Sequence, residues 1–255
     1  MIVKTLEEIE ILREGGRRLG SHVKELCAMV APGVTLVDID RKARELIAAG
    51  GDQSAFLHYP SGLGGEKFPG VVCLSVNDTI VHAPGAIIDY TIKEGDVVTV
   101  DFGIVHRGLF TDHAVTVIAG KGSEADIRLV RGTEEALAAG IKQARVGNTI
   151  GDIGLAVQTV AEKYNFGFPK NLAGHGVGKA VHENPLVPNF VTAGKSEKLV
   201  EGLVIAIEPM MTLGSGDLYV DKDKFSYITR DHSRTAHSEH TVLITKSGPE
   251  ILTKV

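Results

Sequence analysis

Four acidic residues stand at the ends of short apolar runs in this sequence. They are Asp101 after VVTV, Asp112 just before AVTV, Glu208 after VIAI and Glu239 before HTVLIT. Carboxylates gathered on apolar strands repel one another and lose hydration, and a divalent cation resolves both problems. A single acid of this kind is usually a solvated strand end, but four at equivalent strand ends predict a metal site.

A histidine that could complete this site lies in a glycine-rich segment. His175 stands in NLAGHGVGKAVHENP, where Gly174 and Gly176 flank it and His182 follows seven positions later. Small neighbours let backbone and substrate approach closely, and an imidazole adds a nitrogen ligand to an oxygen-rich site. A lone histidine is more often structural. Here the metal-binding acids, and His82 in a related segment, favour His175 as a ligand.

The other histidines are predicted to take no part in chemistry: His22, His58, His106, His113, His232, His237 and His240. His113 and His240 each follow a proposed ligand directly. On a strand, such neighbours point to the opposite face of the sheet, so both are poor candidates for metal binding.

Apolar periodicity predicts the elements that must position these residues. Helices are expected from Thr5 towards Pro32 and over residues 38–49, 124–144 and 150–164, and strands over residues 71–76, 96–105, 110–119, 203–213 and 240–245. Residues 58–70 are rich in glycine and proline and predict a loop. Asp101 and Asp112 should lie opposite each other in a hairpin whose turn is centred between His106 and Arg107.

The order of helices then strands occurs twice, and short motifs repeat with it. GVTLVDID and GNTIGDIG each precede a predicted helix, at an offset of 114 residues. A Phe-Pro pair lies 14 residues before His82 and another lies 14 before His182, an offset of 100. A Glu-Gly pair lies seven residues before Asp101 and another seven before Glu208, an offset of 107. The chain is therefore predicted to be an internal duplication.

This duplication predicts one catalytic domain, residues 1–255, with halves of approximately 1–120 and 121–255. Each half is short for an independent domain of mixed helix and strand. We expect an α+β fold in which pseudo-twofold duplicated halves share a curved antiparallel sheet with helices packed behind it.

Composition narrows the class of protein. The 255 residues include 43% hydrophobic types and carry a formal charge of −5, with no basic footprint for nucleic acid. Cys27 and Cys73 cannot build a disulfide framework. The N-terminal segment has charges within its first eight positions, which does not fit a signal peptide. We expect a cytoplasmic protein that binds neither nucleic acid nor membranes.

The motifs, taken together, resemble the type I methionine aminopeptidases of the pita-bread metallopeptidase family. The segments that carry the resemblance are, in order, LSVNDTIVHAPG, VDFGIVHRGLFTD, AGHGVGKAVHENP, IEPM and SEH. One of them would be modest support, whereas five in order are specific. The HGVGxxxHENP stretch, without a long insertion in the second half, is similar to the type I subclass.

The resemblance implies a pita-bread fold and a site for two divalent metal ions, with Co, Mn, Fe or Zn all compatible. Asp101 would chelate one metal, Asp112 and Glu239 would bridge both, and His175 and Glu208 would complete the other. Catalytic roles are implied for Glu208 as proton acceptor, for His182 at the substrate carbonyl and for His82 beside the scissile amide.

The resemblance also implies the substrate-binding residues, namely His82, His182, Phe68, Cys73 and Phe225. Phe225 matches a position that is often tryptophan in type I enzymes. His113 replaces a usual Thr or Ser, and Phe102-Gly103 after Asp101 is more similar to type II enzymes or the Xaa-Pro branch. These departures leave the metal set intact and bear on side-chain selectivity, as does the loop at 61–67.

The expected function is removal of the initiator methionine from nascent proteins by a monomer that associates transiently with the ribosome. Two alternatives stay open. An Xaa-Pro aminopeptidase or prolidase uses the same metal set but usually carries a further N-terminal domain, and a non-catalytic pita-bread binding protein would normally have lost ligands. Cleavage specificity and metal content discriminate among the three.

Overall fold

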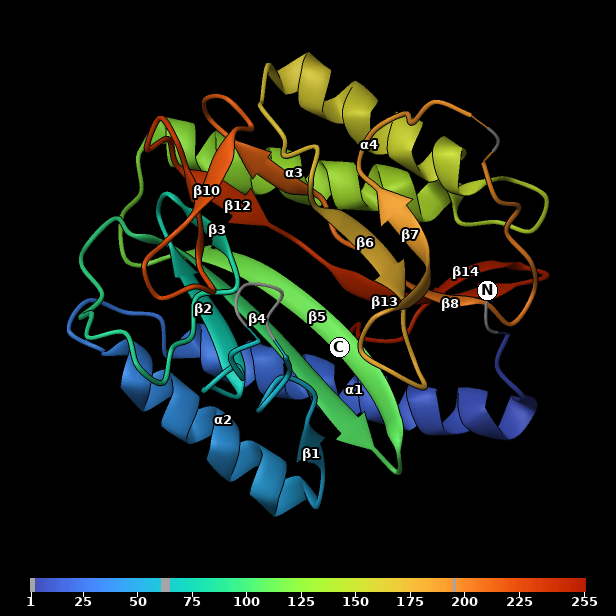
Figure 1. Ribbon diagram of the computed structural model, residues 1–255, viewed down its shortest axis with the longest axis horizontal. Coiled ribbons are helices and arrows are strands. Elements are labelled where there is room, and N and C mark those ends of the chain that lie inside the picture. The colour runs from blue at the N-terminus through green and yellow to red at the C-terminus, as the bar shows by residue number, and fades with distance from the viewer. Residues whose placement is uncertain (1–2, 61–64, 195) are drawn as a thin grey trace.

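Helices precede strands in each half of the chain, as Figure 1 shows for this computed structural model, which describes residues 3–60, 65–194 and 196–255. The first half contains α1 (Leu6–Ala28), α2 (Leu36–Gly50), β1 (Gln53–Ser54), β2 (Val72–Val76), β3 (Thr79–Val81), β4 (Val97–His106) and β5 (Leu109–Ile118). The second half contains α3 (Glu124–Gln143), α4 (Ile150–Tyr164), β6 (Ala173–Gly176), β7 (Glu183–Pro188), β8 (Val204–Ile207), β9 (Met210–Thr212), β10 (Leu218–Val220), β11 (Tyr227–Thr229), β12 (Thr235–His237), β13 (His240–Thr245) and β14 (Gly248–Ile251).

The repeated motif before α2 and α4 is a helix cap. Thr35 accepts a hydrogen bond from the Asp38 backbone N–H at the start of α2. Thr149 does the same for Asp152 at the start of α4, and the Asp152 carboxylate accepts the Thr149 backbone N–H in return. Side chains that satisfy these free N–H groups fix where a helix begins. The two halves therefore begin their second helices with the same chemistry.

Each half builds its own antiparallel sheet. In the first half, β4 lies between β5 on one side and β2 and β1 on the other. In the second half, the strand order is β14-β13-β8-β6-β7. Nine of the ten residues of β4 are buried, so this strand runs through the core. Both faces of β4 are therefore covered, and helix α1 packs against one of them.

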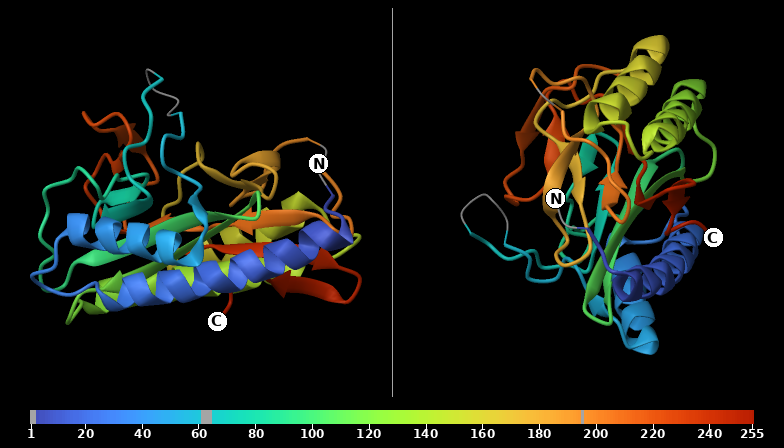
Figure 2. Two further views of the ribbon diagram at one scale, coloured as in Figure 1. Left: turned by 90° about the horizontal axis from the view of Figure 1, so that it is seen from below. Right: turned by 90° about the vertical axis from the view of Figure 1, so that its right-hand side faces the viewer.

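The two sheets meet along β5 and β13 and form one curved surface. The Glu239 N–H donates to Ala114 O at 2.9 Å, and the Thr241 hydroxyl donates to Asp112 O at 2.7 Å. In Figure 2 the helices gather behind the strands, on the side away from the loop near residue 60. Helix α1 packs on β4 and β5, and α3 packs on strands of the second half. Helix α4 packs against α3. The predicted arrangement, in which two halves share a curved antiparallel sheet with helices behind it, is confirmed.

Most predicted elements occur within one or two residues of their expected bounds. The predicted strand at 203–213 is divided, because Glu208 and Pro209 separate β8 from β9. Short strands such as β6, which carries His175, were not predicted. No helix in the described ranges is both long and apolar enough to cross a bilayer. The single domain of residues 1–255 stays a prediction, and residues 61–64 of the expected loop lie outside the described part.

Candidate metal and substrate site

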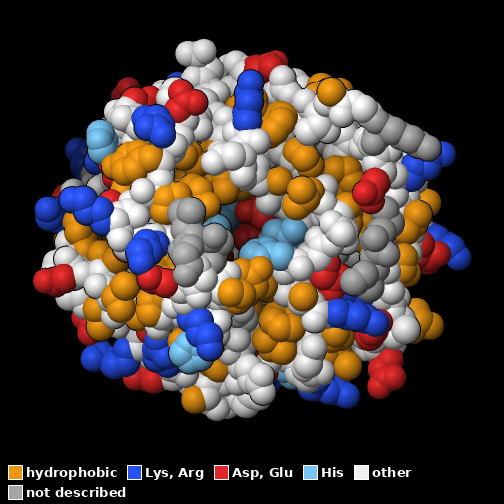
Figure 3. All heavy atoms as spheres, viewed as in Figure 1, with side chains coloured by type: hydrophobic (Ala, Val, Ile, Leu, Met, Phe, Trp, Pro, Cys, Tyr) orange, Lys and Arg blue, Asp and Glu red, His pale blue; other side chains and the backbone are white. Residues whose placement is uncertain are grey.

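A cavity of about 470 Å³ opens between the two halves of the molecule. Figure 3 shows it as a hollow at the centre of one face, where acidic and histidine side chains are visible inside a mainly hydrophobic border. All the residues predicted to bind metal or substrate line it: Phe68, Cys73, His82, Asp101, Asp112, His175, His182, Glu208, Phe225 and Glu239. The fold therefore brings together residues that are up to 171 positions apart in the sequence.

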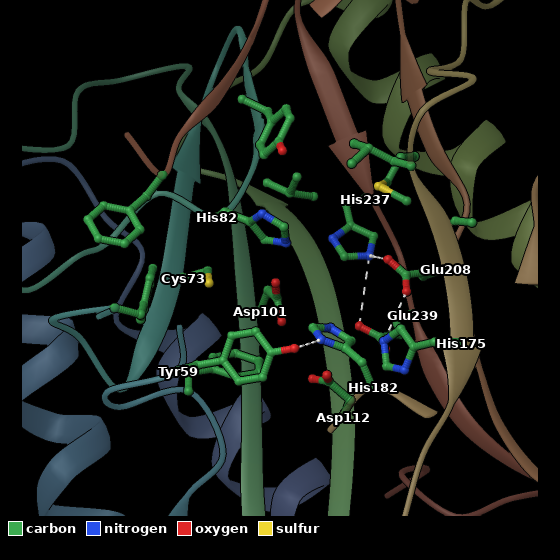
Figure 4. A pocket seen from close by; sticks show the side chains of 18 of the residues that line it. Tyr59, Cys73, His82, Asp101, Asp112, His175, His182, Glu208, His237 and Glu239 are labelled. Carbon is green, nitrogen blue, oxygen red and sulfur yellow. Dashed lines mark hydrogen bonds and ion pairs between the residues drawn. The ribbon is translucent and has the colours of Figure 1, made fainter. Parts of the chain in front are cut away.

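Asp112 and Glu239 lie side by side at the junction of the two sheets. The Asp112 N–H donates to the Thr241 hydroxyl at 2.9 Å, and the Glu239 N–H donates to Ala114 O at 2.9 Å. Both carboxylates are almost fully buried, with side chains facing the cavity (Figure 4). Backbone bonds between β5 and β13 thus hold one acid from each half at the same place.

The predicted pairing of Asp101 with Asp112 is wrong by two residues. Asp101 lies opposite Ala114, and Asp112 lies opposite Gly103. The turn is centred between Arg107 and Gly108, which both have positive φ values, 48° and 83°. A two-residue turn with two positive φ angles suits a tight hairpin. A shift of two residues keeps a side chain on the same face, so both aspartates still face the cavity, diagonally across the two strands.

Three of the predicted ligands converge closely. One donor atom each from Asp112, His175 and Glu239 lies within 4.8 Å of the others. His175 Nε2 is also 3.3 Å from Glu208 Oε1. Two donors that each lie about 2.1 Å from one cation at right angles are roughly 3 Å apart, so this spacing fits a shared cation.

The glycines beside His175 permit its position. A Cβ atom at Gly174 would lie 2.4 Å from Ala206 O, and one at Gly176 would lie 2.6 Å from Asn184 O. Any larger residue would therefore push β6 away from its neighbours. The small residues allow β8 and the HENP segment to close around the imidazole, as the sequence predicted.

Burial makes the acids resist ionisation in the absence of a cation. It raises the pKa of Asp101 and Glu208 well above their ordinary values, and neighbouring carboxylates raise both further. The pKa of Glu239 is raised in the same way, and burial raises that of Asp112 to about 7. Such a cluster favours a ligand that brings positive charge.

The histidine and carboxylate atoms also fit a cation individually. Burial, with a contribution from His182, lowers the pKa of His175 to about 3, so its imidazole is neutral and able to bind metal at pH 7. Glu239 Oε1 is buried without a hydrogen-bond partner among the described residues. An unpaired buried carboxylate oxygen is costly, and a divalent cation would satisfy it. The residues present therefore fit the implied metal ions.

His82 and His182 face the cavity from opposite walls. Their side chains are open to the cavity, yet the atoms crowded around them lower both pKa values, that of His82 to about 4. His82 has a φ of 64°, in the left-handed region, just after β3. The rings of His82 and Tyr227 meet edge to face at 5.5 Å. Both histidines are therefore neutral near pH 7 and able to donate hydrogen bonds.

An aromatic pocket adjoins the acids. Phe68, Cys73 and Phe225 form a buried cluster, and Phe56 packs against it. The Phe68 ring meets Phe225 edge to face at 5.6 Å and Phe56 at 6.4 Å. Burial and the nearby acids raise the pKa of the Cys73 thiol well above its ordinary value, so it is a neutral, apolar lining group. The pocket suits a flexible apolar side chain.

His113 and His240 point away from the acids, as predicted. They line a second cavity on the helix side of the sheet, and their rings stack at 4.5 Å. The prediction that His237 takes no part in the site is wrong. His237 lines the same cavity as Glu208 and Glu239, and its Nε2 is 3.5 Å from Glu208 Oε2.

A signal for His237 was present in the sequence. It stands two residues before Glu239, and residues i and i+2 of an extended segment share a face. His237 therefore shares a face with Glu239, whereas His240 points to the other face. Tyr59, Phe56 and Tyr227 also line the cavity without having been predicted. Nothing in their local sequence indicates the site, because Phe56 and Tyr59 reach it from a loop and Tyr227 from a three-residue strand.

Comparisons with known proteins agree with this geometry. Residues 10–246 match the family model of metallopeptidase family M24. The chain is 41% identical to the methionine aminopeptidase of Aquifex aeolicus, over 97% of this chain and 96% of that one. It is 36% identical to methionine aminopeptidase 1 of Bacillus subtilis over 100% of both chains.

Solved structures extend the comparison. The methionine aminopeptidase of Thermotoga maritima superposes with a TM-score of 0.92 and 38% identity over 100% of both chains. The prolidase of Pyrococcus furiosus has a TM-score of 0.76 and 23% identity, and this chain covers 66% of it. The likeness to prolidase extends to the fold alone.

Proposed function

Because the chain belongs to metallopeptidase family M24, we propose that it removes the N-terminal methionine from newly made proteins by metal-dependent hydrolysis. The observation that carries this proposal is a cavity in which Asp112, His175 and Glu239 bring donor atoms within 4.8 Å of one another beside an aromatic pocket. That combination can hold a cation next to the place where an apolar side chain binds. Full-length similarity to methionine aminopeptidases supports the same activity.

The proposed ligand set would hold two divalent ions. Asp101 would bind one of them, Asp112 and Glu239 would serve both, and His175 and Glu208 would bind the other. The junction of β5 with β13 supports the bridging role, since it fixes Asp112 and Glu239 side by side. Oxygen and imidazole donors suit Mn, Fe, Co or Zn, and availability in the cell selects among them as much as affinity does.

The bound ions would polarise the scissile carbonyl and lower the pKa of a water molecule to about 7. The protein's own groups then handle protons and orientation. Glu208 accepts the proton of the attacking water, since its carboxylate lines the cavity beside the other ligands. Neutral His182 donates a hydrogen bond to the developing oxyanion. His82, across the cavity, positions the scissile amide.

Methionine selectivity would come from the aromatic pocket. Phe68, Cys73 and Phe225 bury an unbranched thioether side chain, and Phe56 closes one side of their cluster. Sulfur near aromatic edges contributes about 0.3–1.5 kcal/mol for each contact. A branched or charged side chain would lose this fit, because the pocket walls are rings held edge to face.

We also place the enzyme in the cytoplasm, as a monomer that meets nascent chains at the ribosome in transient contacts. Two free cysteines support a reducing compartment. The proposed substrate supports contact with the ribosome, since the initiator methionine is removed while the chain is being made. Co-sedimentation with ribosomes that carry a nascent chain, and light scattering of the purified protein, test these points.

The deciding experiment compares two peptides. Protein stripped with a chelator is assayed on Met-Ala-Ser and Ala-Pro-Ser, with and without added Mn²⁺ or Co²⁺, by following release of the N-terminal residue. Metal-dependent release of methionine alone is expected. Preferential cleavage before proline would reassign the chain to the Xaa-Pro branch, and metal binding without any cleavage would indicate a non-catalytic relative.

A further inference from the structure

The imidazole of His237 lies between two of the proposed ligands. Its Nε2 is 3.5 Å from Glu208 Oε2 and 3.8 Å from Glu239 Oε2. Figure 4 shows the ring pointing towards both carboxylates from the wall formed by the end of β12. His175 approaches the other oxygen of Glu208, with Nε2 at 3.3 Å from Oε1. Glu208 therefore stands between two imidazoles, one for each carboxylate oxygen.

His237 is buried and lacks hydrogen bonds. The residue is 2% exposed, and neither ring nitrogen has a hydrogen-bond partner among the described residues. A buried N–H without an acceptor costs roughly 1–3 kcal/mol. The nearest acceptors are the two carboxylates, and a movement of a few tenths of an ångström would bring Glu208 within hydrogen-bond distance.

The backbone of His237 is fixed from both halves of the molecule. Its N–H donates to Thr116 Oγ1 at 2.9 Å, and the Thr116 hydroxyl donates back to His237 O at 2.6 Å. Thr116 belongs to β5 of the first half, whereas His237 pairs with Met210 of β9 in the second half. The ring is therefore held in place from behind, so it can restrain a carboxylate.

We propose that His237 is a positioning residue whose Nε2–H donates to the carboxylate of Glu208, and secondarily to that of Glu239, and holds them ready for metal. This inference rests on the proposed two-metal site. A ligating carboxylate that is hydrogen-bonded keeps its orientation and its charge, and outer partners of this kind typically change metal affinity 10–100-fold.

Donation fits the geometry better than direct coordination does. His237 approaches Glu208 on Oε2, the oxygen opposite to the one that faces His175. The His237 ring therefore contacts the Glu208 carboxylate on the side away from His175, which is a proposed metal ligand.

The test measures binding of Mn²⁺ alone to chelator-stripped protein by calorimetry, with folding checked by circular dichroism. His237→Leu removes the donor at similar volume, and His237→Gln keeps an amide N–H near the position of Nε2. His22→Leu is the matched control, because His22 is a partly buried histidine on α1 with an unpaired Nε2, packed near Phe102 and not lining the cavity. We expect about 10–100-fold weaker binding for His237→Leu, recovery to within about threefold in His237→Gln, and no change in His22→Leu.

The outcomes separate this inference from the proposed function. Wild-type protein that binds Mn²⁺ and cleaves Met-Ala-Ser, together with a His237→Leu variant that binds as tightly, would overturn the inference alone. Equal losses in the Leu and Gln variants would show that the imidazole coordinates metal, which also overturns it. Wild-type protein that binds no metal would instead overturn the proposed function.

A measurement on the wild type keeps the inference testable if His237→Leu does not fold. The ¹⁵N signals of His237 in Zn²⁺-loaded protein report which ring nitrogen carries hydrogen. A protonated Nε2 without bound metal is expected. A metal-bound or unprotonated Nε2 would contradict the proposed donation.

Discussion

The hydroxyl of Tyr59 lies 2.7 Å from Nδ1 of His182, although 123 residues separate them in the sequence. Their rings meet edge to face at 5.1 Å. Burial raises the pKa of Tyr59, so the phenol stays protonated and can donate a hydrogen bond to Nδ1. In that arrangement the hydrogen of neutral His182 lies on Nε2, on the far side of the ring from Tyr59.

Tyr59→Phe is expected to lower kcat about 5–30-fold with little change in KM, because it removes one hydrogen bond and keeps the ring. Steady-state kinetics on Met-Ala-Ser with saturating Mn²⁺ measure the effect. Tyr219→Phe is the matched control, since Tyr219 also packs edge to face on a histidine, His232, but does not line the cavity. Equal kcat values in wild type and Tyr59→Phe would mean that the phenol does not orient His182.

Metal binding and turnover are expected to separate between two classes of variant. Asp112→Asn and Glu239→Gln should lose Mn²⁺ binding and activity together, since each removes a charge from the proposed bridge. His182→Ala should keep Mn²⁺ and lose roughly 10²–10³-fold in kcat, the usual cost of removing an oxyanion donor. Calorimetry and peptide hydrolysis on the same preparations make the comparison. Full activity in Asp112→Asn or Glu239→Gln would contradict the proposed ligand set.

In metal-free protein, the contribution of Asp112 to stability is expected to be lost as the pH rises. Burial raises the pKa of Asp112 to about 7 in the folded state, against about 3.9 in an unfolded chain. Between these values the Asp112 carboxyl holds more protons in the folded state than in the unfolded chain, so its contribution is complete below about pH 4 and is lost as the pH rises towards 7. The free energy of unfolding of wild type minus that of Asp112→Asn, measured in urea with EDTA, should fall by roughly 1–3 kcal/mol across this window.

Two controls identify the source of this pH dependence. Asp112→Asn removes the ionisation of this one carboxyl and leaves the buried histidines, whose lowered pKa values act in the opposite direction. Saturating Mn²⁺ should raise stability most at pH 7, because the ion binds the carboxylates in their ionised form. A difference between wild type and Asp112→Asn that does not fall from pH 4.5 to 7 in EDTA would contradict the raised pKa of Asp112.

The buried pair of Lys4 and Glu183 should stabilise the segment that carries His182. Lys4 Nζ lies 2.7 Å from Glu183 Oε2, with the two side chains 0% and 3% exposed. Glu183 Oε1 also accepts the backbone N–H groups of Lys179 and Ala180. Lys4→Met leaves a buried carboxylate without its cation, so we expect a loss of about 2–4 kcal/mol by urea unfolding.

Lys42→Met provides the contrast for the buried pair. Lys42 Nζ lies 2.6 Å from Glu25 Oε1 on the surface, and such pairs contribute little to stability. The urea unfolding midpoint of Lys42→Met should equal that of the wild type. If Lys4→Met also leaves the midpoint unchanged, the buried pair contributes nothing to the folded state.

The sequence by itself determined the elements and most of the site. Thr149 with Asp152 marks the start of α4 through hydrogen bonds within one turn, and apolar runs mark the long strands. Those signals are local, so a few neighbouring residues encode them. The repeated spacing around Asp101 and Glu208 added the symmetry of the two halves, and with it the gathering of acids from distant strands.

Only the tertiary structure decided how these parts face one another. The hairpin register follows from a turn with positive φ values at Arg107 and Gly108. In this register Asp101 lies opposite Ala114 and not opposite Asp112. His237 became part of the site because β12 pairs with β9 and is tied to Thr116. Tyr59 reaches His182 through a loop. Such contacts join segments far apart in the chain, and their geometry follows from packing, which no short stretch of sequence encodes.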